Sequence, residues 1–497
     1  MNAKLSMESP GNWAVETLRS LTVGSGLFKD GDWIESKDQD PNGEVRLIQL
    51  ADIGDGLFVD KSSRFLTKSK AKELRCTFLE KGDLLIARMP EPLGRTCIFP
   101  LEGDHKYVTV VDVCIVRASP EKVNSKYLMY LLNSPDIRTK IDSLKSGSTR
   151  KRISRGNLSI IELPVASLEE QEDIVIEIET LFSELDKGIE SLRTARQQLK
   201  AYRQAVLKHA FEGKLTEQWR QENPDKLESP EQLLTRIQQE GEQSYQKQLE
   251  DWRKAVKTWE ANGKKGKKRG KPKSPVFGAQ DANCDISMPN SWTPISLGSI
   301  AGIAGGLTKN QKRNSYSQKM RYLRVANVYA DKLVLDDIQE IGVTSSEFEK
   351  VKLEKNDLLI VEGNGSVDQI GRVSLWDASI SDCGHQNHLI KVRLDNPEYA
   401  RLVLLFLLSP VGRDLIVKEA SSTSGLHTLS ISKISNLCIP VMPQEEAIRL
   451  LALIDEKTTN ADKMIEEIDA QLLRSETLRQ SILKNAFFNQ LPKGGHD

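Results

Sequence analysis

The sequence lacks the hydrophobic segments that membrane insertion requires. Its longest uninterrupted apolar run, LVLLFLL at 402–408, has seven residues, whereas a helix needs roughly 20 to cross a bilayer. The first residues, MNAKLSMESPGNW, contain no hydrophobic signal core. We therefore expect a soluble, cytoplasmic protein with no membrane partner.

Cysteine is scarce, and neither sign of charge is in excess. The six cysteines are scattered, with no C-x-x-C pair and no histidine spacing typical of zinc, which favours reduced thiols and no structural metal. Lys and Arg together number 70, as do Asp and Glu, so the formal net charge is zero. Any attraction to nucleic acid must therefore come from local basic clusters.

The motifs of common nucleotide-dependent and DNA-modifying enzymes are absent as well. The tract GKKGKKRGK lacks the G-x-x-x-x-G-K-[ST] spacing of a phosphate-binding loop, and no G-x-G-x-x-G follows an expected strand. The chain has neither the N/D-P-P-Y/F tetrapeptide nor the F-x-G-x-G element expected if it methylated DNA bases itself. A self-contained methyltransferase is therefore disfavoured.

Two weaker patterns add little to the case for catalysis. Asp136 precedes Asp142-x-x-Lys145, but the acid stands three residues before the lysine, and the nuclease pattern needs two. His385 and His388 lie close to a cysteine, but no remote carboxylate completes a metal site. We expect no catalytic, cofactor or metal site in the chain.

The chain does contain two long helical segments with a repeating apolar pattern. The first begins near Ser167 and runs to Phe211, and the second, PQEEAIRLLALIDEKTTNADKMIEEIDAQLLRSETLRQSILKNAFF, lies near the chain end. Apolar positions step mostly by three and four residues, the spacing of a coiled-coil seam. The segments also begin and end alike: ELPVASLEEQ matches CIPVMPQEE, and AVLKHAF matches SILKNAF. We infer that the two helices pair with each other.

The two helices close two copies of an internal repeat. Among the matches, LEKGDLLIAR at 79–88 returns as LEKNDLLIVE at 353–362, with seven of ten positions identical. The order of the matches is preserved along the chain, so coincidence is improbable and the chain is duplicated. The other matches are RLIQLADI with RYLRVANV, GRT at 94–96 with GRV at 371–373, and NSP at 133–135 with LSP at 408–410.

Each copy mixes short strands with helices. Segments such as VRLIQLADI, DLLIAR and DVCIVRA are rich in β-branched residues and are separated by Gly, Asp and Asn clusters. One helix is expected over SKYLMYLLNSPDIRTKIDSL, with EYARLVLLFLLSPVGRDLIVKEA as its counterpart. The predicted fold class is α+β: two duplicated α/β domains, separated by two long antiparallel coiled-coil helices, with pseudo-twofold symmetry.

The predicted boundaries place a charged insert between the two copies. Within the insert, a polar helix is expected to be capped by Ser229, with Pro230 at its first position. The basic tract GKKGKKRGKPKSP follows, and a solvated spacer is a simpler interpretation of it than a phosphate-binding arm. The segments are domain 1 at 1–165, the central helix at 166–212, the insert at 213–288, domain 2 at 289–441 and the C-terminal helix at 442–490.

Basic clusters lie at different places in the two copies. In the first they fill the loop SLKSGSTRKRISRGN, whereas in the second they lie early, in GGLTKNQKRNSYSQKMRYLR. Clustered Lys and Arg neutralise phosphates, and Arg is the usual reader of guanine. Different contact residues on a shared frame are what reading two different half-sites requires. The candidate DNA-contacting residues are Lys29, Lys37, Arg46, Gln49, Arg88, Arg95, Lys145, Arg150, Lys151, Arg152, Arg155, Lys309, Lys312, Arg313, Arg321, Arg324, Arg372 and His427.

Three stretches of the chain are characteristic of one protein family. They are the opening GSGLFKDGDWIESKDQDPNGEVRLIQLADIGDG, the helix entry LPVASLEEQEDI and the helix exit YRQAVLKHAFEGKLTEQWRQENP. Together with the duplicated plan, they resemble the specificity (S) subunit of type I restriction-modification enzymes. The resemblance covers nearly the whole chain, and the second domain matches mainly by position and pattern.

The resemblance implies a function and a set of partners. Such subunits carry two target recognition domains, each reading one part of a split, asymmetric site in double-stranded DNA, and they have no catalytic activity or cofactor of their own. Two modification (methyltransferase) subunits, which bind S-adenosylmethionine and methylate adenine, assemble on them. Restriction (translocase/nuclease) subunits that use ATP and Mg complete the nuclease. The helices, about 60 Å long at ~1.5 Å per residue, would then act as a ruler between the half-sites.

The alternative is a duplicated coiled-coil scaffold that assembles proteins without sequence-specific DNA binding. Its basic loops would only confer solubility. Salt dependence of DNA binding would not separate the two hypotheses, because any basic surface shows it. Discrimination between DNA sequences would separate the two hypotheses.

Overall fold

The computed structural model describes residues 13–24, 26–264, 268, 270–272, 274, 286–423 and 426–489. The chain forms two compact units, the first comprising residues 1–195 and 467–497 and the second residues 196–466. Each of the two long helices therefore contributes to both units. Among the described helices, none combines the length and the apolar character that crossing a membrane requires.

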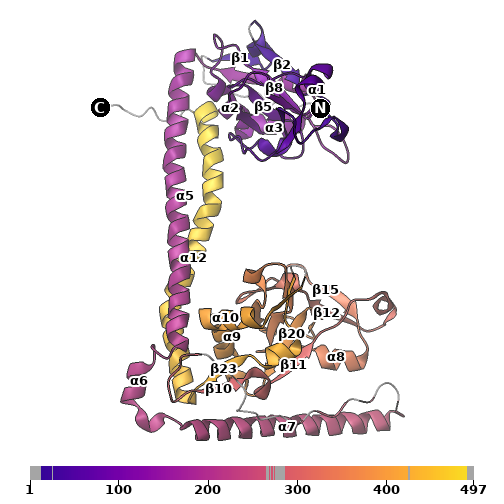
Figure 1. The fold of residues 1–497 in the computed structure, drawn as a ribbon, viewed down its shortest axis with the longest axis vertical. Helices are drawn as coiled ribbons and strands as arrows, with labels where there is room; N and C mark the ends of the chain where they lie inside the picture. The colour runs from indigo at the N-terminus through magenta and orange to yellow at the C-terminus, as the bar shows by residue number, and fades with distance from the viewer. Residues whose placement is uncertain are drawn as a thin grey trace. The chain divides into compact units, whose positions relative to one another are not determined.

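The first unit is built on a four-stranded antiparallel sheet (Figure 1). Its central strand β5 carries the sequence LLIA, and all four of its side chains are buried, as expected for a strand covered on both faces. The strand order is β2 (Leu27–Asp30), β8 (Val113–Arg117), β5 (Leu84–Ala87) and β6 (Thr96–Ile98). A second sheet has the order β4 (Arg64–Leu66), β3 (Val45–Ile48) and β7 (Tyr107–Thr109), and β1 (Ala14–Thr17) pairs with β9 (Glu162–Val165).

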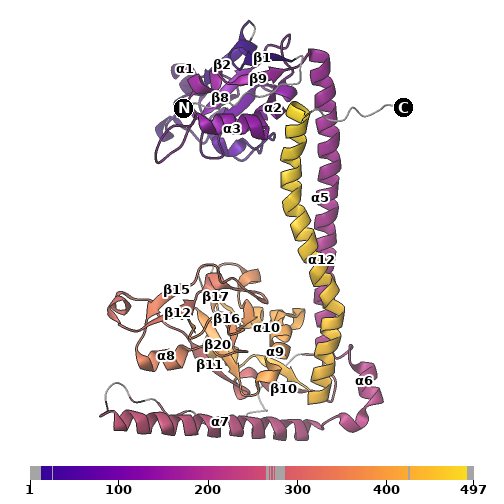
Figure 2. The same ribbon diagram turned by 180° about the vertical axis from the view of Figure 1, so that it is seen from behind.

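The second unit repeats this plan (Figures 1 and 2). Its four-stranded sheet has the order β11 (Ala301–Gly305), β20 (Leu389–Leu394), β16 (Leu358–Val361) and β18 (Val373–Leu375). Its three-stranded sheet has the order β15 (Gln339–Gly342), β12 (Lys319–Leu323) and β19 (Gly384–His385), and β10 (Thr293–Ser296) pairs with β23 (Cys438–Val441). The order matches that of the first unit strand for strand, which confirms the α+β fold and the duplication. Two small additions are the pair β13 (Val328–Tyr329) and β14 (Lys332–Leu333), and the sheet β17 (Gly363–Asn364), β22 (Leu426–Thr428) and β21 (Ser421–Thr423).

The single helix expected in each copy is in fact two helices. In the first unit the chain turns at Ser134, whose backbone is extended with ψ at 148°, and Pro135 begins the next helix. Proline has no N–H to donate and suits the first position of a helix. Ser409 and Pro410 break the second copy in the same way. The helices are α1 (Lys68–Glu73), α2 (Ser125–Asn133), α3 (Pro135–Ser143) and α4 (Arg155–Ser159), with counterparts α8 (Ser345–Val351), α9 (Ala400–Leu408), α10 (Pro410–Glu419) and α11 (Ile431–Ser435).

The long helices α5 (Leu168–Phe211) and α12 (Gln444–Lys484) pair within each unit. In the first unit, Ile178 of α5 shares a core with Ile482 of α12. In the second, Leu207 of α5 shares a core with Leu450 of α12. Early residues of one helix thus meet late residues of the other, so the pairing is antiparallel, as predicted.

The matching ends of the two helices, KHAF and KNAF, place a phenylalanine in each core. Phe487, just beyond α12, packs edge-on against Tyr127 of α2 at 5.2 Å between ring centroids. Phe211 at the end of α5 packs edge-on against Phe406 of α9, also at 5.2 Å. The sequence repeat at the helix ends therefore reflects a packing requirement that recurs in both units.

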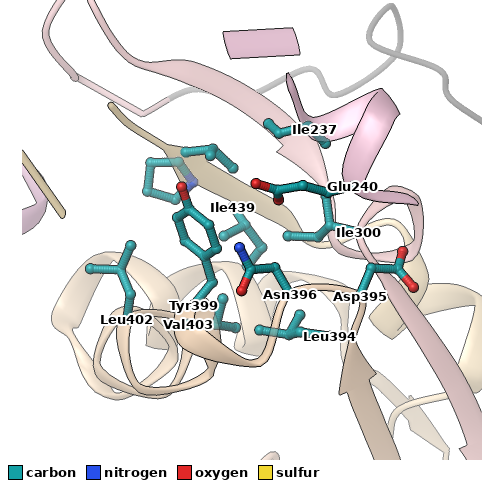
Figure 3. A pocket seen from close by; sticks show the side chains of 12 residues that line it. Ile237, Glu240, Ile300, Leu394, Asp395, Asn396, Tyr399, Leu402, Val403 and Ile439 are labelled. Atoms are coloured by element: carbon teal, nitrogen blue, oxygen red, sulfur yellow. The ribbon is translucent and has the colours of Figure 1, made fainter. Parts of the chain in front are cut away.

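The insert contributes the short helix α6 (Glu217–Glu222) and the long helix α7 (Pro230–Ala261) to the second unit. Ser229 caps α7 by accepting from the Gln232 backbone N–H at 3.3 Å, as expected. Ile237 of α7 packs against Val441 of β23. Figure 3 shows Ile237 and Glu240 of α7 on one side of a cavity, with Tyr399 and Leu402 on the other. The volume of this cavity is about 20 Å³. A space of that size holds roughly one water molecule, so this is a packing interface. Residues 265–267, 269, 273 and 275 of the basic tract after α7 lie outside the described residues.

The free thiols are buried. Burial raises the pKa of Cys76, Cys97 and Cys383 to about 12, and Cys114 is also free and buried. Such thiols are inert at neutral pH. Cys438 is disulfide-bonded, so the expectation of reduced thiols is wrong at that position.

Candidate nucleic-acid interface

One end of the four-stranded sheet gathers many of the candidate residues in each unit. In the first unit, the Arg88 N–H donates to Asp112 O at 2.9 Å where β5 ends and β8 begins. The Ile153 N–H donates to Arg88 O at 3.1 Å and so joins the basic loop to the sheet. We call this the first sheet-end surface; it comprises residues 31–35, 88–95, 110–112 and 144–155. The second sheet-end surface comprises the corresponding residues 306–316, 362–372, 386–388, 421–423 and 426–428.

The basic loop of the first surface is a tight hairpin. Ser146 and Arg152 exchange two backbone hydrogen bonds of 2.9 Å each. Gly147 adopts a φ of +99°, and a Cβ there would lie 2.5 Å from Arg150 O, so the turn requires glycine. The hairpin side chains of Arg150, Lys151 and Arg152 are exposed. The backbone thus presents three basic side chains on a short, fixed ribbon.

The acidic residues around the hairpin neutralise only some of its charges. Lys145 pairs with Asp142 at 2.8 Å and with Glu91 at 3.1 Å, and these contacts raise its pKa. Lys151 lies 3.4 Å from Glu91, whose pKa is lowered by the two lysines. Arg150 and Arg152, by contrast, form no ion pair with any described residue. Their guanidinium groups are the unneutralised charges of the hairpin.

The base of the hairpin is organised by one carboxylate. Asp30, at the end of β2, lies 3.5 Å from Arg88 and 3.7 Å from Arg155. Arg88 also donates to Val111 O and is mostly covered, with 13% of its side chain exposed. Arg88 and Arg155 therefore support the hairpin, whereas Arg150 and Arg152 are its exposed arginines.

Several other candidates of the first unit are engaged in local contacts. Lys37 pairs with Glu35 at 2.7 Å, which raises the pKa of Lys37. Arg46 pairs with Asp60 and donates to Ser62 O at 3.0 Å. Of the remaining three, Lys29 donates to Thr77 Oγ1 at 3.3 Å, Gln49 precedes the 3-10 turn Leu50–Asp52, and Arg95 lies half-buried before β6.

Sequence reasoning missed an exposed tryptophan on the first surface. The Trp33 side chain is 70% exposed, and its Nε1–H donates to Glu35 at 3.3 Å. Its neighbour Asp32 is fixed on both sides: its N–H donates to Thr109 O, and its carboxylate accepts from the Thr77 N–H, each at 2.8 Å. Charge alone does not single out Trp33, although an aromatic residue in a Gly/Asp loop is visible in the sequence.

The second surface carries its basic residues on the loop after β11. Lys309 and Lys312 are exposed there. Arg313 is 7% exposed and donates to Thr308 O at 2.6 Å and Gly342 O at 3.0 Å. With Glu347 at 2.9 Å as an ion-pair partner, Arg313 fastens the loop to the sheet.

A polar pocket of about 300 Å³ lies beside this loop. Its lining combines amide, ammonium and hydroxyl groups with a single carboxylate, Glu340. Amide side chains pair with adenine and lysine with guanine or phosphate, so the lining suits nucleic acid. The lining residues are Lys309, Asn310, Gln311, Arg313, Asn314, Lys319, Tyr322, Gln339, Glu340, Ile341 and Gly342.

The remaining candidates of the second unit are distributed around the pocket and the sheet end. Arg321 is exposed on β12, opposite Glu340 in the strand register, and Arg324 pairs with Asp337 at 2.5 Å. Arg372 stacks over the Tyr329 ring, and His427 is half-buried on β22.

The two histidines considered as metal ligands are held apart by their contacts. His388 pairs with Glu362 at 3.1 Å, and its side chain is 57% exposed on the second sheet-end surface. His385 is fully buried with its Nδ1 3.1 Å from Val351 O, and burial lowers its pKa to about 4. Within the described ranges, no group of three His, Cys, Asp or Glu residues could hold a metal ion.

The chain is similar to known proteins in both sequence and fold. The family model "Type I restriction modification DNA specificity domain" matches residues 10–194. The StySPI specificity subunit of Salmonella potsdam is 24% identical over 75% of this chain and 67% of its own. The EcoKI specificity subunit of Escherichia coli K12 is 25% identical over the same shares. A solved chain of a type I R-M system aligns with a TM-score of 0.62 at 15% identity, over 98% of this chain and 100% of that chain, and so shares the fold.

Proposed function

We propose that the chain is a type I restriction enzyme specificity subunit and that it reads a bipartite, asymmetric site in double-stranded DNA, one part through each unit. It contributes recognition and no chemistry of its own. The first surface reads one half-site and the second reads the other.

The observation that carries this proposal is the hairpin at the first surface. A major groove about 12 Å wide admits a two-stranded ribbon, and the hairpin offers one with Arg150 and Arg152 exposed and without an ion pair to any described residue. Arginine binds guanine O6 and N7 with two hydrogen bonds. Because Glu91 neutralises Lys145 and Lys151, the two free arginines are the best placed to contact bases.

The second unit would read its half-site with different chemistry. Its loop at 308–316 combines exposed lysines with the amide-lined pocket, which favours contacts to adenine and to phosphate. Its paired strands β21 and β22 carry His427 in place of the arginines of the first hairpin. The two surfaces therefore suit two different base sequences, as an asymmetric site demands.

The proposed partners supply the chemistry. Two modification subunits would bring S-adenosylmethionine and methylate adenine, and restriction subunits would bring ATP- and Mg-dependent translocation and cleavage. We further propose that the lengths of α5 and α12 set the number of unread base pairs between the half-sites, since each residue adds ~1.5 Å to a helix.

Selection from a random duplex library tests the proposal. The full chain, purified with its modification subunits, should enrich a single motif made of two specified parts and an unspecified spacer of constant length. Retention of DNA without any enriched motif would support the scaffold alternative, because a basic surface retains all sequences alike.

A further inference from the structure

Most side chains at the two sheet-end surfaces differ between the units. Arg88 follows β5 in the first unit, and Glu362 follows β16 in the second. The Arg88 N–H donates to Asp112 O, and at the matching position the Glu362 N–H donates to His388 O. The chemistry at matched positions is thus reversed in sign or replaced. Such positions suit the reading of different bases.

One turn at this end is the same in both units. Gly94 and Gly371 adopt φ angles of +77° and +64°. A Cβ on Gly94 would lie 2.6 Å from Ile141 of α3, and one on Gly371 would lie 2.4 Å from Ile416 of α10. Each position therefore requires glycine, because a side chain there would be strained by the positive φ and would clash with a helix. The residue that follows it is presented in the same local frame in both units.

That following residue is arginine in both units. Arg95 O accepts from the Ala87 N–H at 2.8 Å, and Arg372 O accepts from the Val361 N–H at 2.9 Å, so both occupy the first position opposite the central strand. Neither guanidinium forms an ion pair with a carboxylate in the described part of the chain. The Nε of each is buried and has no hydrogen-bond partner. Arg372 is also held over the Tyr329 ring, 4.7 Å from its centroid.

A second repeated arginine shows what a purely structural role looks like. Arg138 of α3 pairs with Asp55 at 3.2 Å, and Arg413 of α10 donates to Ile370 O at 2.6 Å. Both lie on the helix that supports the glycine turn, and both are fastened within their own unit. The side chain of Arg95 makes no such contact with any described residue. Among the described residues, Arg372 donates to two neutral oxygens, those of Gln369 and Val325, each at a longer 3.3 Å.

The two units must read different bases but hold the same sugar-phosphate backbone. Base contacts specify a sequence, whereas phosphate contacts fix the position of a protein on the duplex. A charge that recurs at one position of both units, among neighbours that differ, suits the task that does not depend on sequence. Building on the proposed function, we propose that Arg95 and Arg372 are positioning residues that each contact a DNA phosphate.

The test replaces each arginine in the full chain, purified with its modification subunits. Arg95→Gln, Arg372→Gln and Arg95→Lys are compared on a duplex bearing the selected motif and on a scrambled duplex, between about 50 and 200 mM salt. Each glutamine variant should weaken binding to both duplexes by the same factor, roughly threefold to tenfold, and reduce the salt slope by about one. The selected motif should stay unchanged, and lysine should restore most of the affinity because a phosphate accepts from either cation.

Matched variants and a folding measurement keep the outcomes separate. Arg150→Gln should relax one position of the motif, in contrast to Arg95→Gln. If Arg95→Gln also relaxed a motif position without changing the salt slope, Arg95 would be a base reader and the proposal would be wrong. A lower melting temperature that Arg95→Lys fails to restore would assign it a structural role and equally overturn the proposal. A wild-type chain without any selected motif would instead refute the proposed function on which this inference rests.

Discussion

The two units place their positive charge on different loops of the same frame. In the first, Arg150 and Arg152 are exposed on the hairpin at 146–152, and the loop after β2 carries Asp32, Glu35 and Asp38. In the second, the loop after β11 is basic, and the hairpin has His427 instead. The difference shows that basic residues can lie on different loops while the sheets beneath them keep their order.

The frame itself is maintained by matching ion pairs, each with a buried aspartate. Asp83 is 1% exposed and accepts two hydrogen bonds from Arg117, at 2.7 and 2.9 Å. Asp357, also 1% exposed, accepts two from Arg393, both at 2.7 Å. These residues join the start of the central strand to its neighbour in each sheet. This ion pair is thus the same in both units, whereas the residues of the two sheet-end surfaces differ.

The largest expected effect comes from breaking this shared frame. Asp83→Asn and Asp357→Asn should each destabilise their own unit by about 1–3 kcal/mol, because each removes a buried charge that accepts hydrogen bonds from an arginine, although Glu80 and Glu354 still pair with those arginines. Calorimetry of the full chain should show one transition lowered by Asp83→Asn and the other by Asp357→Asn. If either substitution lowered both transitions equally, the units would not be independent in stability.

Exchanging the free charges should separate the two half-sites. Arg150→Ala with Arg152→Ala should relax the first half of the motif, because each bidentate arginine–guanine pair supplies about 1–3 kcal/mol of discrimination. Lys309→Ala with Lys312→Ala is the mirror change and should affect only the second half. Selection from the random duplex library measures both effects as changes in the enriched motif. Relaxation of both halves by one double substitution would contradict the assignment of one surface to each half.

The spacer between the half-sites should depend on the long helices and not on the surfaces. Seven residues inserted into both α5 and α12 add roughly 10 Å, which corresponds to about three base pairs at ~3.4 Å each. Inserting them into both helices preserves the seam repeat. The selected motif should keep both halves and lengthen only its spacer; an unchanged spacer would count against the ruler.

A smaller effect concerns a buried lysine that is present only in the second unit. In the strand pairing of the second unit, Lys391 lies opposite Leu359. The equivalent residue of the first unit is Ile115, which lies opposite Leu85. Its Nζ donates to Lys350 O at 3.2 Å and Lys352 O at 3.0 Å, and burial lowers its pKa to about 8. Because this pKa lies below the unfolded value of about 10.4, the unfolded state binds more protons between the two values. The second unit should therefore gain stability as pH rises from about 8 to about 10.

Lys391→Met should abolish that gain. Calorimetry at about pH 7.5 and 9.5 should show the upward shift in the wild-type transition of the second unit and none in the variant. The first unit serves as the internal control, since Ile115 does not titrate. A wild-type transition that falls over this range to the same extent as the variant would show that Lys391 is not the responsible group.

Much of this architecture could be predicted from the sequence. The repeat, the two pairing helices and the family resemblance are confirmed, because each depends on patterns spread over many residues. The break at Ser134 was missed although Pro135 signals it, because the apolar pattern continues on both sides. The neutralisation of Lys145 and Lys151 by Glu91 could not be foreseen, since these residues are brought together only by folding. The burial of Arg313 depends on the same kind of tertiary contact.

The most direct measurement of the central claim is genome-wide mapping of adenine methylation in cells that express the chain with its modification subunits. Single-molecule sequencing should reveal one asymmetric motif with two specified parts. Exchanging residues 146–152 for the second unit's 421–428 should change one part and preserve the other. Methylation without a motif, or a change in both parts at once, would contradict the account of two units that each read their own half-site.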